Sequence, residues 1–357
     1  MPQDPLDRFD PTLPRRRFLQ AGAAGAFLCA IGGEKVALSK AGDAAKADAA
    51  AARVRRPRSA EPTEQQRFVT PQPQPGGTAR EYWIQARTVR WTVVPTRRDD
   101  WHGRPVPGAS TFRACVYQQM TPGFAAPLGP AEIPGPTLHA EVGDTLVVHF
   151  RNALSLDQAV TMHPHGVKYN PEYDGVYLGD YTRAGGFIEP GEEFTYTWEA
   201  TPDSVGAWPY HDHGPNHTLN TFRGMFGALI VREKGAPVPD VEEVLFLHQL
   251  IPPATGLRRA FQCINGRAYA GNTPTVRARV GNSVEMYVFG MDNNFHDFHI
   301  HGHRWKDSAG ASVDTPAVGP NETVAVRFIE DNPGRWLYHC HVFSHQDVGM
   351  AGWYLVE

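Results

Sequence analysis

Residues 336–341 read WLYHCH, and residues 208–213 read WPYHDH. Each hexamer begins with a tryptophan and ends in two histidines separated by one residue. Residues two apart on a β-strand point to the same face, so each hexamer predicts a strand that presents two imidazole rings side by side. The match indicates a chain built from two copies of one β unit.

Further landmarks repeat in the same order on either side of these hexamers. They are PTL with VGD (136–144) against PTV with VGN (274–282), HPHG (163–166) against HIHG (299–302), and EPGEEFTYTW (189–198) against GPNETVAVRF (319–328). A repeat of this length predicts tandem domains. We expect an all-β chain of two β-sandwiches, at residues 80–232 and 240–357, joined by EKGAPVPD at 233–240.

The composition supports a globular β protein. The 357 residues are 41% hydrophobic, and 35 glycines and 31 prolines punctuate short runs rich in Val, Thr, Tyr, Phe and Trp, which is typical of an all-β sandwich. The formal net charge is −4, and the body of the chain has no stripe of Lys and Arg interleaved with aromatics. We therefore expect no nucleic-acid partner.

The N-terminus has the pattern of an export signal. PRRRFLQ at 14–20 precedes an apolar, small-residue run from Ala21 to Ile31, which resembles a twin-arginine signal. We expect a signal peptide at 1–33, export by the twin-arginine machinery, and a periplasmic or secreted protein. The run is shorter than the roughly 20 residues of a membrane span, so we expect no stable membrane insertion. Residues 34–79 lack hydrophobic periodicity, which predicts a disordered linker.

Four H-x-H pairs, two from each repeat, are the candidate metal ligands. One pair alone is weak evidence, but four pairs at matching places predict a metal cluster, because unmetallated buried rings would be costly to desolvate. The pairs are His163/His165, His211/His213, His299/His301 and His339/His341.

Cys340 lies between two of these histidines and must face the opposite way. One strand would then contact two metal environments. With His296, His345 and Met350, Cys340 supplies two imidazoles, a thiolate and a thioether, which is the blue-copper combination. The alternative role for Cys340, half of a disulfide or a small buried hydrophobe, leaves its histidine neighbours unexplained.

These motifs, in this order, resemble those of the multicopper oxidases, and the two-domain length is similar to that of the small bacterial laccases. The resemblance implies a cupredoxin-like Greek-key fold for both domains and about four copper ions per protomer. It implies the following ligands: His296, Cys340, His345 and Met350 for type 1 copper; His163 and His299 for type 2; His165, His211, His213, His301, His339 and His341 for the type 3 pair.

The resemblance also implies an activity. One-electron oxidation of a small phenolic or aromatic amine substrate would be coupled to four-electron reduction of O₂ to water, with a metal-ion substrate, Fe(II), Cu(I) or Mn(II), as the alternative. Electrons would arrive through the exposed edge of His296 or His345 and pass through Cys340 to its two histidine neighbours. The small laccases form homotrimers in which the trinuclear site lies between subunits, so we expect the same here.

The first repeat departs from the second at one position. Asp212 stands where the second repeat has Cys340, so the first domain would lack a blue site; His217 could be a relic of one. His303 is expected to support the site or face solvent. Downstream, Tyr169 and Asp174 are spaced as in the small laccases, which makes Asp174 the candidate proton donor; an ordinary Asp-Gly turn is the alternative.

Two rival functions remain. A copper nitrite reductase keeps its blue site in the first domain, and a pure electron-transfer or copper-storage protein would not need eight paired histidines. Cys29 would leave with the signal, which leaves a disulfide between Cys115 and Cys263 as an open question. The physiological substrate depends on loops that no motif encodes.

Overall fold

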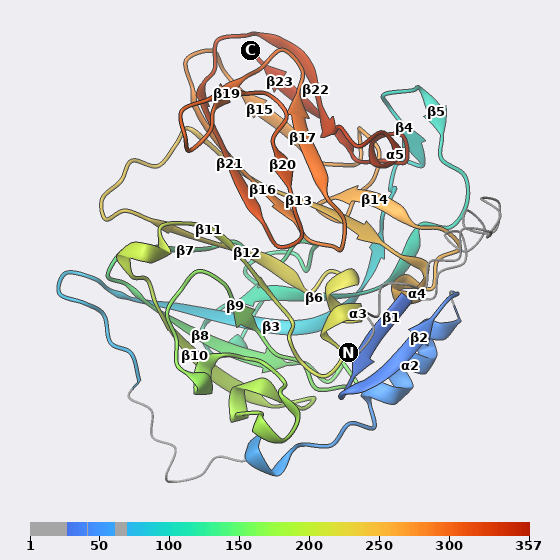
Figure 1. Cartoon of the computed structure of the whole chain (residues 1–357), viewed down its shortest axis with the longest axis vertical. Coiled ribbons are helices and arrows are strands. Elements are labelled where there is room, and N and C mark those ends of the chain that lie inside the picture. The colour runs from blue at the N-terminus through green and yellow to red at the C-terminus, as the bar shows by residue number, and fades with distance from the viewer. Residues whose placement is uncertain (1–26, 41, 61–69) are drawn as a thin grey trace, which may run out of the picture.

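The chain forms two β-sandwiches that lie one above the other in Figure 1, the first in cyan to yellow-green and the second in orange to red. The structure is a computed structural model, and it describes residues 27–40, 42–60 and 70–357. Most of the expected signal peptide, residues 1–26, lies outside the described residues.

The first sandwich has two four-stranded sheets, in the orders β10-β8-β3-β6 and β7-β12-β11-β9. β8 alternates buried and partly exposed positions, because side chains of a strand point to opposite faces. The strands are β3 (Ala79–Thr92), β6 (Thr111–Met120), β7 (Leu138–Glu141), β8 (Thr145–Asn152), β9 (His163–Pro164), β10 (Glu193–Glu199), β11 (Gly206–His211) and β12 (Phe226–Arg232).

The second sandwich has the sheets β14-β13-β16-β21 and β15-β23-β22-β17-β20. Its strands are β13 (Val241–Leu250), β14 (Phe261–Ile264), β15 (Thr275–Ala278), β16 (Ser283–Gly290), β17 (His296–Ile300), β20 (Ala317–Val318), β21 (Thr323–Ile329), β22 (Gly334–Cys340) and β23 (Ala351–Val356). A separate hairpin pairs β18 (Trp305–Lys306) with β19 (Ser312–Val313).

The sequence repeat is also a repeat of topology. β3 pairs with β8 in parallel as β13 pairs with β16, and β7 pairs with β12 in parallel as β15 pairs with β23. Most neighbours in each sheet are not consecutive in the chain, which is the Greek-key arrangement of cupredoxin-like sandwiches. The fold class expected from the sequence is confirmed.

Each sandwich has its own core, and a third core joins them. The shared core takes Phe226 from β12 and Phe246 and Phe289 from the second sandwich. The rings of Phe226 and Phe246 lie 4.8 Å apart and those of Phe246 and Phe289 lie 4.4 Å apart; such pairs contribute about 0.5–1.5 kcal/mol each beyond their burial. The junction is therefore packed like a domain interior, although a polar segment, residues 233–240, connects β12 to β13.

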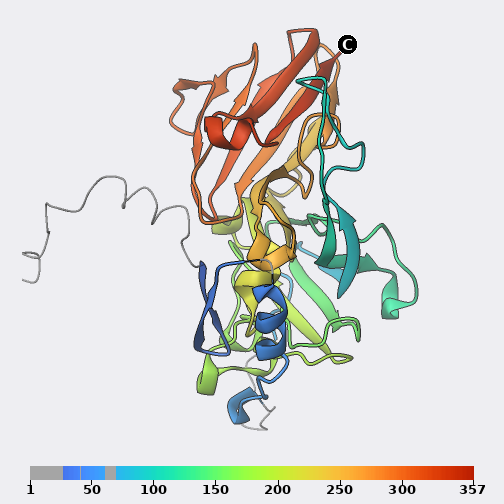
Figure 2. The ribbon, with the colours of Figure 1, turned by 90° about the vertical axis from the view of Figure 1, so that its right-hand side faces the viewer.

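An excursion between β3 and β6, residues 93–110, leaves the first sandwich and runs beside the second. It contains β4 (Arg98–Asp99) and β5 (Arg104–Pro105), which pair with each other. In Figure 2 this cyan segment rises from the lower sandwich along the upper one. At its base, Trp91 Nε1 donates a hydrogen bond of 2.7 Å to the carbonyl of Gly266.

Beyond the N-terminal segment, the described helices are short. They are α3 (His217–Phe222), α4 (Pro252–Thr255), α5 (Phe343–Gln346) and the 3₁₀ turns η2 (Pro122–Phe124), η3 (Pro171–Tyr173), η4 (Gly179–Tyr181), η5 (Ala184–Gly186) and η6 (Pro202–Ser204).

The segment expected to be a disordered linker, 34–79, differs from the structure in its first half. β2 (Glu34–Leu38) pairs with β1 (Phe27–Ile31) and is followed by α2 (Asp43–Ala51) and η1 (Arg58–Ala60). β1, β2 and α2 share a small core with α3 and α4 that buries Cys29, and Arg223 Nη2 donates to Asp48 at 3.1 Å. Cys29 thus lies in a packed strand, whereas the sequence placed it in a departing leader.

The reason for this difference is the composition of α2. Its packed face consists of Ala44, Ala47 and Ala51, which bury too little apolar surface to give a hydrophobic period. The large apolar partners, such as Leu219, come from elsewhere in the chain. The contact with these partners therefore decides which face of the helix is buried. Residues 61–69 of the expected linker lie outside the described residues.

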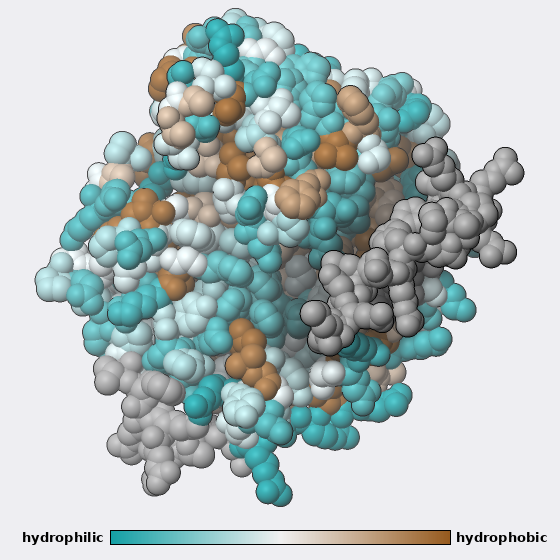
Figure 3. Space-filling model, viewed as in Figure 1, coloured by the Kyte–Doolittle hydropathy of each residue, from teal (hydrophilic) through white to brown (hydrophobic). Residues whose placement is uncertain are grey.

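The surface in Figure 3 is mostly hydrophilic, and its brown areas are small and separate on this face. Among the described residues, no helix has the length and apolar character needed to cross a membrane.

Candidate metal centres

The last residue of β22 forms the first candidate centre. Cys340 is fully buried, and its Sγ lies 3.8 Å from Nδ1 of His296 and 3.7 Å from Nδ1 of His345. His296 begins β17, and His345 lies on α5. A ligand atom from each of these three residues lies within 4.8 Å of the others. Two imidazoles and a thiol at this spacing fit a His₂Cys copper site.

Met350 and Asp292 complete the surroundings of this centre. Met350 is fully buried in the same core as Cys340, and its carbonyl accepts a hydrogen bond of 3.1 Å from the amide of Cys340. Asp292, which no sequence motif marks, has an oxygen 3.2 Å from Nε2 of His296. This contact holds the ring with Nδ1 toward the sulfur. Asp292 carried no signal in the sequence because it belongs to a loop outside every repeated landmark.

The protonation chemistry of this group favours a thiolate. Burial raises the pKa of the Cys340 thiol, but hydrogen bonds with His296, His345 and backbone amides outweigh it and lower the pKa to about 7. Burial lowers the pKa of His296, but its hydrogen bonds to Asp292 and Cys340 raise that pKa to about 9. The thiolate is the form that binds metals, so the site is prepared for one.

Neither imidazole edge is openly exposed, contrary to the sequence expectation. His296 is 0% exposed and His345 is 7% exposed. Asp292 covers the outer nitrogen of His296. Of the two residues, His345 is the more exposed.

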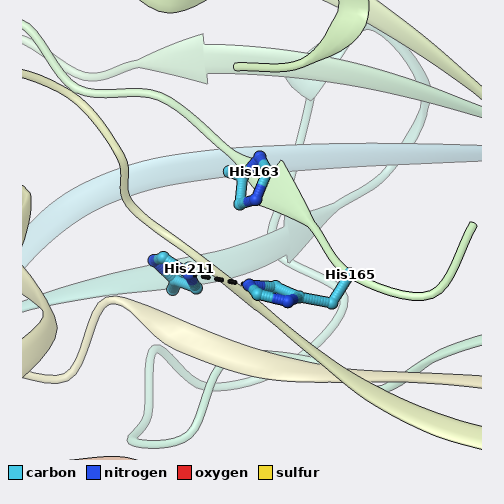
Figure 4. Close-up of side chains that lie close together, drawn as sticks. All are labelled: His163, His165 and His211. Carbon is cyan, nitrogen blue, oxygen red and sulfur yellow. Dashed lines mark hydrogen bonds between the residues drawn. The ribbon is translucent and has the colours of Figure 1, made fainter. Parts of the chain in front are cut away.

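Four histidines of the first sandwich form a second group, and Figure 4 shows three of them, His163, His165 and His211. His163 comes from β9 and His211 from β11, which pair at these two residues. The ring centroids of His163 lie 5.0 Å from His165, 5.5 Å from His211 and 5.3 Å from His213. Nε2 of His165 lies 3.1 Å from Nε2 of His211, the pair joined by the dashed line in Figure 4.

The second sandwich holds an equivalent group. His299 and His339 are register partners on β17 and β22. The ring of His299 lies 5.2 Å from His301, 5.5 Å from His339 and 5.7 Å from His341. Nε2 of His301 and Nε2 of His339 lie 3.1 Å apart, which repeats the spacing found in the first group.

Backbone carbonyls fix the orientation of four of these rings. In each case Nδ1 donates to a carbonyl, which leaves Nε2 as the metal-binding atom. The bonds are His163 to Asp174 (2.6 Å), His211 to Asp212 (2.8 Å), His299 to Asp314 (2.9 Å) and His339 to Cys340 (2.9 Å).

The two groups have the properties of metal ligands. Burial lowers the pKa of His165, His213 and His339 to about 4, so these rings are neutral at pH 7, the state that binds metal. Nδ1 of His213 is buried and makes no hydrogen bond, although buried polar atoms are normally paired. A metal ion would satisfy it, so the residues present fit copper.

No candidate metal-binding set combines histidines of both sandwiches in the described part of the chain. Besides the set of Cys340, there are two sets made only of histidines: His163, His165 and His211 in the first sandwich, and His299, His301 and His339 in the second. The structure therefore brings together the ligands of each half and not the eight histidines as a whole.

Tyr169 and Asp174 both lie beside His163. The ring of Tyr169 is 6.0 Å from that of His163, and Oδ1 of Asp174 is 3.2 Å from its Nδ1. Burial and the neighbouring Asp174 carboxylate raise the pKa of Tyr169 to about 12. Asp314, whose carbonyl holds His299, is the counterpart of Asp174. The sequence does not reveal this correspondence, because the histidine-to-aspartate separation is 15 residues there and 11 in the first sandwich.

Among the described residues of the first sandwich, no blue-copper set lies at the matching place. Asp212 is fully buried and accepts hydrogen bonds from the amides of Thr161 and Gly214 and from Asn220. Its amide donates to the carbonyl of Met225, as that of Cys340 does to Met350, so Met225 matches the axial position. His217 stacks on His213, with ring centroids 4.5 Å apart. Among the described residues, no candidate metal-binding set contains His217 or Asp212.

His303 supports the second group from outside. Its Nδ1 donates to the carbonyl of His301 at 2.8 Å, and its Nε2 lies 3.1 Å from the buried carboxylate of Glu330, which also accepts from Tyr354. The ring is buried, so of the two roles expected for His303 the supporting one fits and the solvent one does not.

Cys115 and Cys263 do not form a disulfide. Both thiols are free and buried. Cys115 belongs to the core of the first sandwich, whereas Cys263 belongs to the shared core.

Two cupredoxin-like sandwiches with one Cys-His-His centre and two histidine groups define a class, the two-domain copper proteins. Models of the multicopper oxidase family match residues 130–236 and 247–357. The chain belongs to the multicopper oxidase family.

Individual relatives agree with this assignment. The chain is 30% identical, over 63% of its length, to a probable nitrite reductase-hydroxylamine oxidoreductase fusion protein of Kuenenia stuttgartiensis, and 27% identical, over 79%, to the ferroxidase HEPHL1 of Homo sapiens. It spans 28% and 30% of the length of these two relatives. A solved multicopper oxidase structure is 25% identical, with a TM-score of 0.63 over 81% of this chain and 92% of that one.

Proposed function

We propose that the protein is a laccase-like multicopper oxidase that couples one-electron oxidation of a small reducing substrate to reduction of O₂ to water. The observation that carries this proposal is the position of Cys340. Its sulfur belongs to the Cys-His-His centre, while its carbonyl holds His339 of the histidine group. Two centres that share one residue can exchange electrons over a short covalent path.

The residues would divide as follows. His296, Cys340, His345 and Met350 hold the type 1 ion; His163 and His299 hold the type 2 ion; His165, His211, His213, His301, His339 and His341 hold the type 3 pair. About four copper ions per protomer would supply the one-electron chemistry that side chains lack. The chain's own part is to orient the rings and to keep them neutral.

A second copy of the chain would complete the trinuclear centre. The histidine groups of the two sandwiches are separate within one chain, and the shared aromatic core fixes the sandwiches to each other. A first sandwich of one copy facing the second sandwich of the next closes into a ring. We propose a homotrimer, with each centre at a subunit junction.

Asp174 is the proposed proton donor at this centre. Its carbonyl orients His163, and its carboxylate lies beside the same ring. Tyr169 lies next to both and keeps its proton at neutral pH, because its pKa is about 12. A carboxylate that can be reprotonated is the group able to pass protons to reduced oxygen.

The substrate class follows from family membership and remains a proposal. Phenols and aromatic amines come first, because a buried His296 and a nearly buried His345 favour electron transfer through a ring edge over metal coordination. A metal-ion substrate is the second candidate, which the similarity to a ferroxidase supports. Nitrite reduction is less favoured, because Asp212 occupies the cysteine position of the first sandwich.

The test compares these substrates on one preparation. The protein is loaded with copper, its metal content is measured, and O₂ uptake is followed with a phenol, with a ferrous salt and with neither. Phenol-dependent uptake with a blue absorption band supports the proposal. Uptake with the ferrous salt alone would move the assignment to a metal oxidase, and nitrite consumption without O₂ uptake would refute it.

We also propose export by the twin-arginine route to the periplasm or beyond, and a division into sandwiches at 80–232 and 240–357. The arginine motif at 15–17 and the segment 233–240 between β12 and β13 support these two proposals. Substitution of lysine for the arginines at 15–17 should keep the protein in the cytoplasm, and cell fractionation would measure this.

A further inference from the structure

The excursion 93–110 belongs to the first sandwich, yet it is anchored on the second. The amide of Asp100 donates to the carbonyl of Ala270 at 3.0 Å. Thr96 Oγ1 donates to Asn272 at 2.8 Å, and Asn272 donates in turn to the carbonyl of Arg98 at 2.8 Å. Figure 2 shows the excursion lying along the second sandwich.

The approach is close and well packed. A Cβ at Gly271, where φ is +90°, would meet the Asp100 carboxylate at 2.1 Å, so only glycine permits the crossing. Val93, Val94 and Val106 are buried in the shared core. The excursion is therefore a fixed part of the structure.

A carboxylate at its tip holds the backbone of Trp101 and the ring of His102. Asp99 is 2% exposed, and its carboxylate accepts from the amide of Trp101 at 3.1 Å and from Nδ1 of His102 at 2.7 Å. The rings of Trp101 and His102 lie 4.4 Å apart. Buried charge-assisted bonds of this kind fix geometry, so Asp99 sets the backbone at Trp101 and the His102 ring against which the indole packs.

The indole lies against the second histidine group. Its ring is stacked on that of His339, with centroids 6.3 Å apart and an interplanar angle of 26°. His339 is already fixed at its edge, by Cys340 through Nδ1, and its Nε2 points toward His301. Trp101 adds a cover on the face of the ring.

We propose that Trp101 is a positioning residue that covers His339 and slows the loss of copper from the second histidine group, with Asp99 and His102 holding the indole in place. The inference rests on the proposed function, since it takes His339 as a copper ligand. A ligand ring dissociates by turning away while water replaces it. An indole on the face of the ring blocks that turn and keeps water out, as outer partners of metal ligands do.

Trp101 would act on His339 before a second copy of the chain binds. Trp101 belongs to the same chain as His339, whereas the other half of the trinuclear centre would come from the next copy. The cover therefore protects the second histidine group before the partner arrives. His339 would thus be held on one side by Trp101 of its own chain and on the other by the histidine group of the next copy.

The test measures copper retention by the assembled, copper-loaded protein. Trp101→Leu and Trp101→Phe are compared with wild type for the rate at which EDTA removes copper, with the blue band followed separately. We expect Trp101→Leu to lose trinuclear copper about tenfold faster while the blue band is kept, and Trp101→Phe to behave nearly as wild type because it keeps a ring.

Trp83 offers a matched control. It stacks on His149 at 4.5 Å and 23°, on β3 and β8 of the first sandwich, away from every candidate ligand set. Trp83→Leu should leave copper loss unchanged. Equal copper loss by Trp101→Leu and wild type would overturn the inference, as would equal loss by Trp101→Leu and Trp101→Phe at a raised rate. A wild-type protein that never binds trinuclear copper would instead refute the proposed function.

Discussion

The main-chain carbonyl of Cys340 accepts a hydrogen bond of 2.9 Å from Nδ1 of His339, although the two side chains point to opposite sides of β22. The sulfur faces one candidate centre and the ring faces the other. Since the two residues are consecutive, the path between centres needs no contact through space. A substitution at Cys340 should therefore separate the properties of the two centres.

Cys340→Ser should abolish the blue absorption band and leave the trinuclear copper in place, because serine is a poor ligand for the type 1 ion while the histidines are untouched. The loaded variant should hold about one copper ion fewer per chain, and phenol-dependent O₂ uptake should disappear. Metal analysis and visible absorption test this. Cys115→Ala, a buried thiol outside every candidate set, is the control, and a blue Cys340→Ser protein would contradict the assignment.

Asp174→Asn should slow O₂ reduction about a hundredfold without changing the blue band. Asparagine keeps the carbonyl that orients His163 but cannot carry the proton. Stopped-flow reoxidation of the fully reduced protein measures the step. Asp180→Asn changes an exposed acid of the same loop and should have no effect; reoxidation at the wild-type rate in Asp174→Asn would make this residue a turn former only.

Two inactive variants should restore activity when mixed. One carries His163→Ala and His165→Ala, the other His299→Ala and His301→Ala, so each lacks one half of the trinuclear centre. If the centre forms between subunits, subunit exchange of a 1:1 mixture rebuilds about a quarter of the junctions. O₂ uptake that stays at the level of the separate variants would mean that each chain builds its own centre.

Glu243→Gln should stabilise the protein at high pH. Burial raises the pKa of Glu243 from 4.5 to about 7, so the folded state keeps a proton that the unfolded state has lost between these values. The stability contributed by the neutral carboxyl is complete below pH 4.5 and is lost as the pH rises through 7.

The variant should thus match wild type at pH 4.5 and exceed its free energy of unfolding by on the order of 2 kcal/mol at pH 8. Urea unfolding at the two pH values measures the difference. Glu233→Gln, an exposed acid on the connecting segment, should show no pH-dependent gain. A constant difference for Glu243→Gln would show that Glu243 does not titrate in this range.

The sequence was a good guide wherever a short period carried the information. The alternation of a strand places His339 and Cys340 on opposite faces, and the repeated hexamers predict two similar sandwiches; both expectations agree with the fold. The sequence of the N-terminal segment was a poor guide to its structure. The buried face of α2 consists of alanine, and its apolar partner, Leu219, lies far away in the sequence.

By itself, the sequence determined the two β units, the four histidine pairs and the grouping of Cys340 with His345 and Met350, because residues near each other on one strand or turn have their relative directions set by backbone geometry. Only the tertiary structure decided that Asp292 holds His296, that Trp101 covers His339, and that the histidine groups stay apart within one chain. Asp292 lies only four residues before His296, but their contact depends on the conformation of an irregular loop. The other two relations join distant segments through the shared core, which also contains Val93, Val94 and Val106 of the excursion. No local period records either kind of contact.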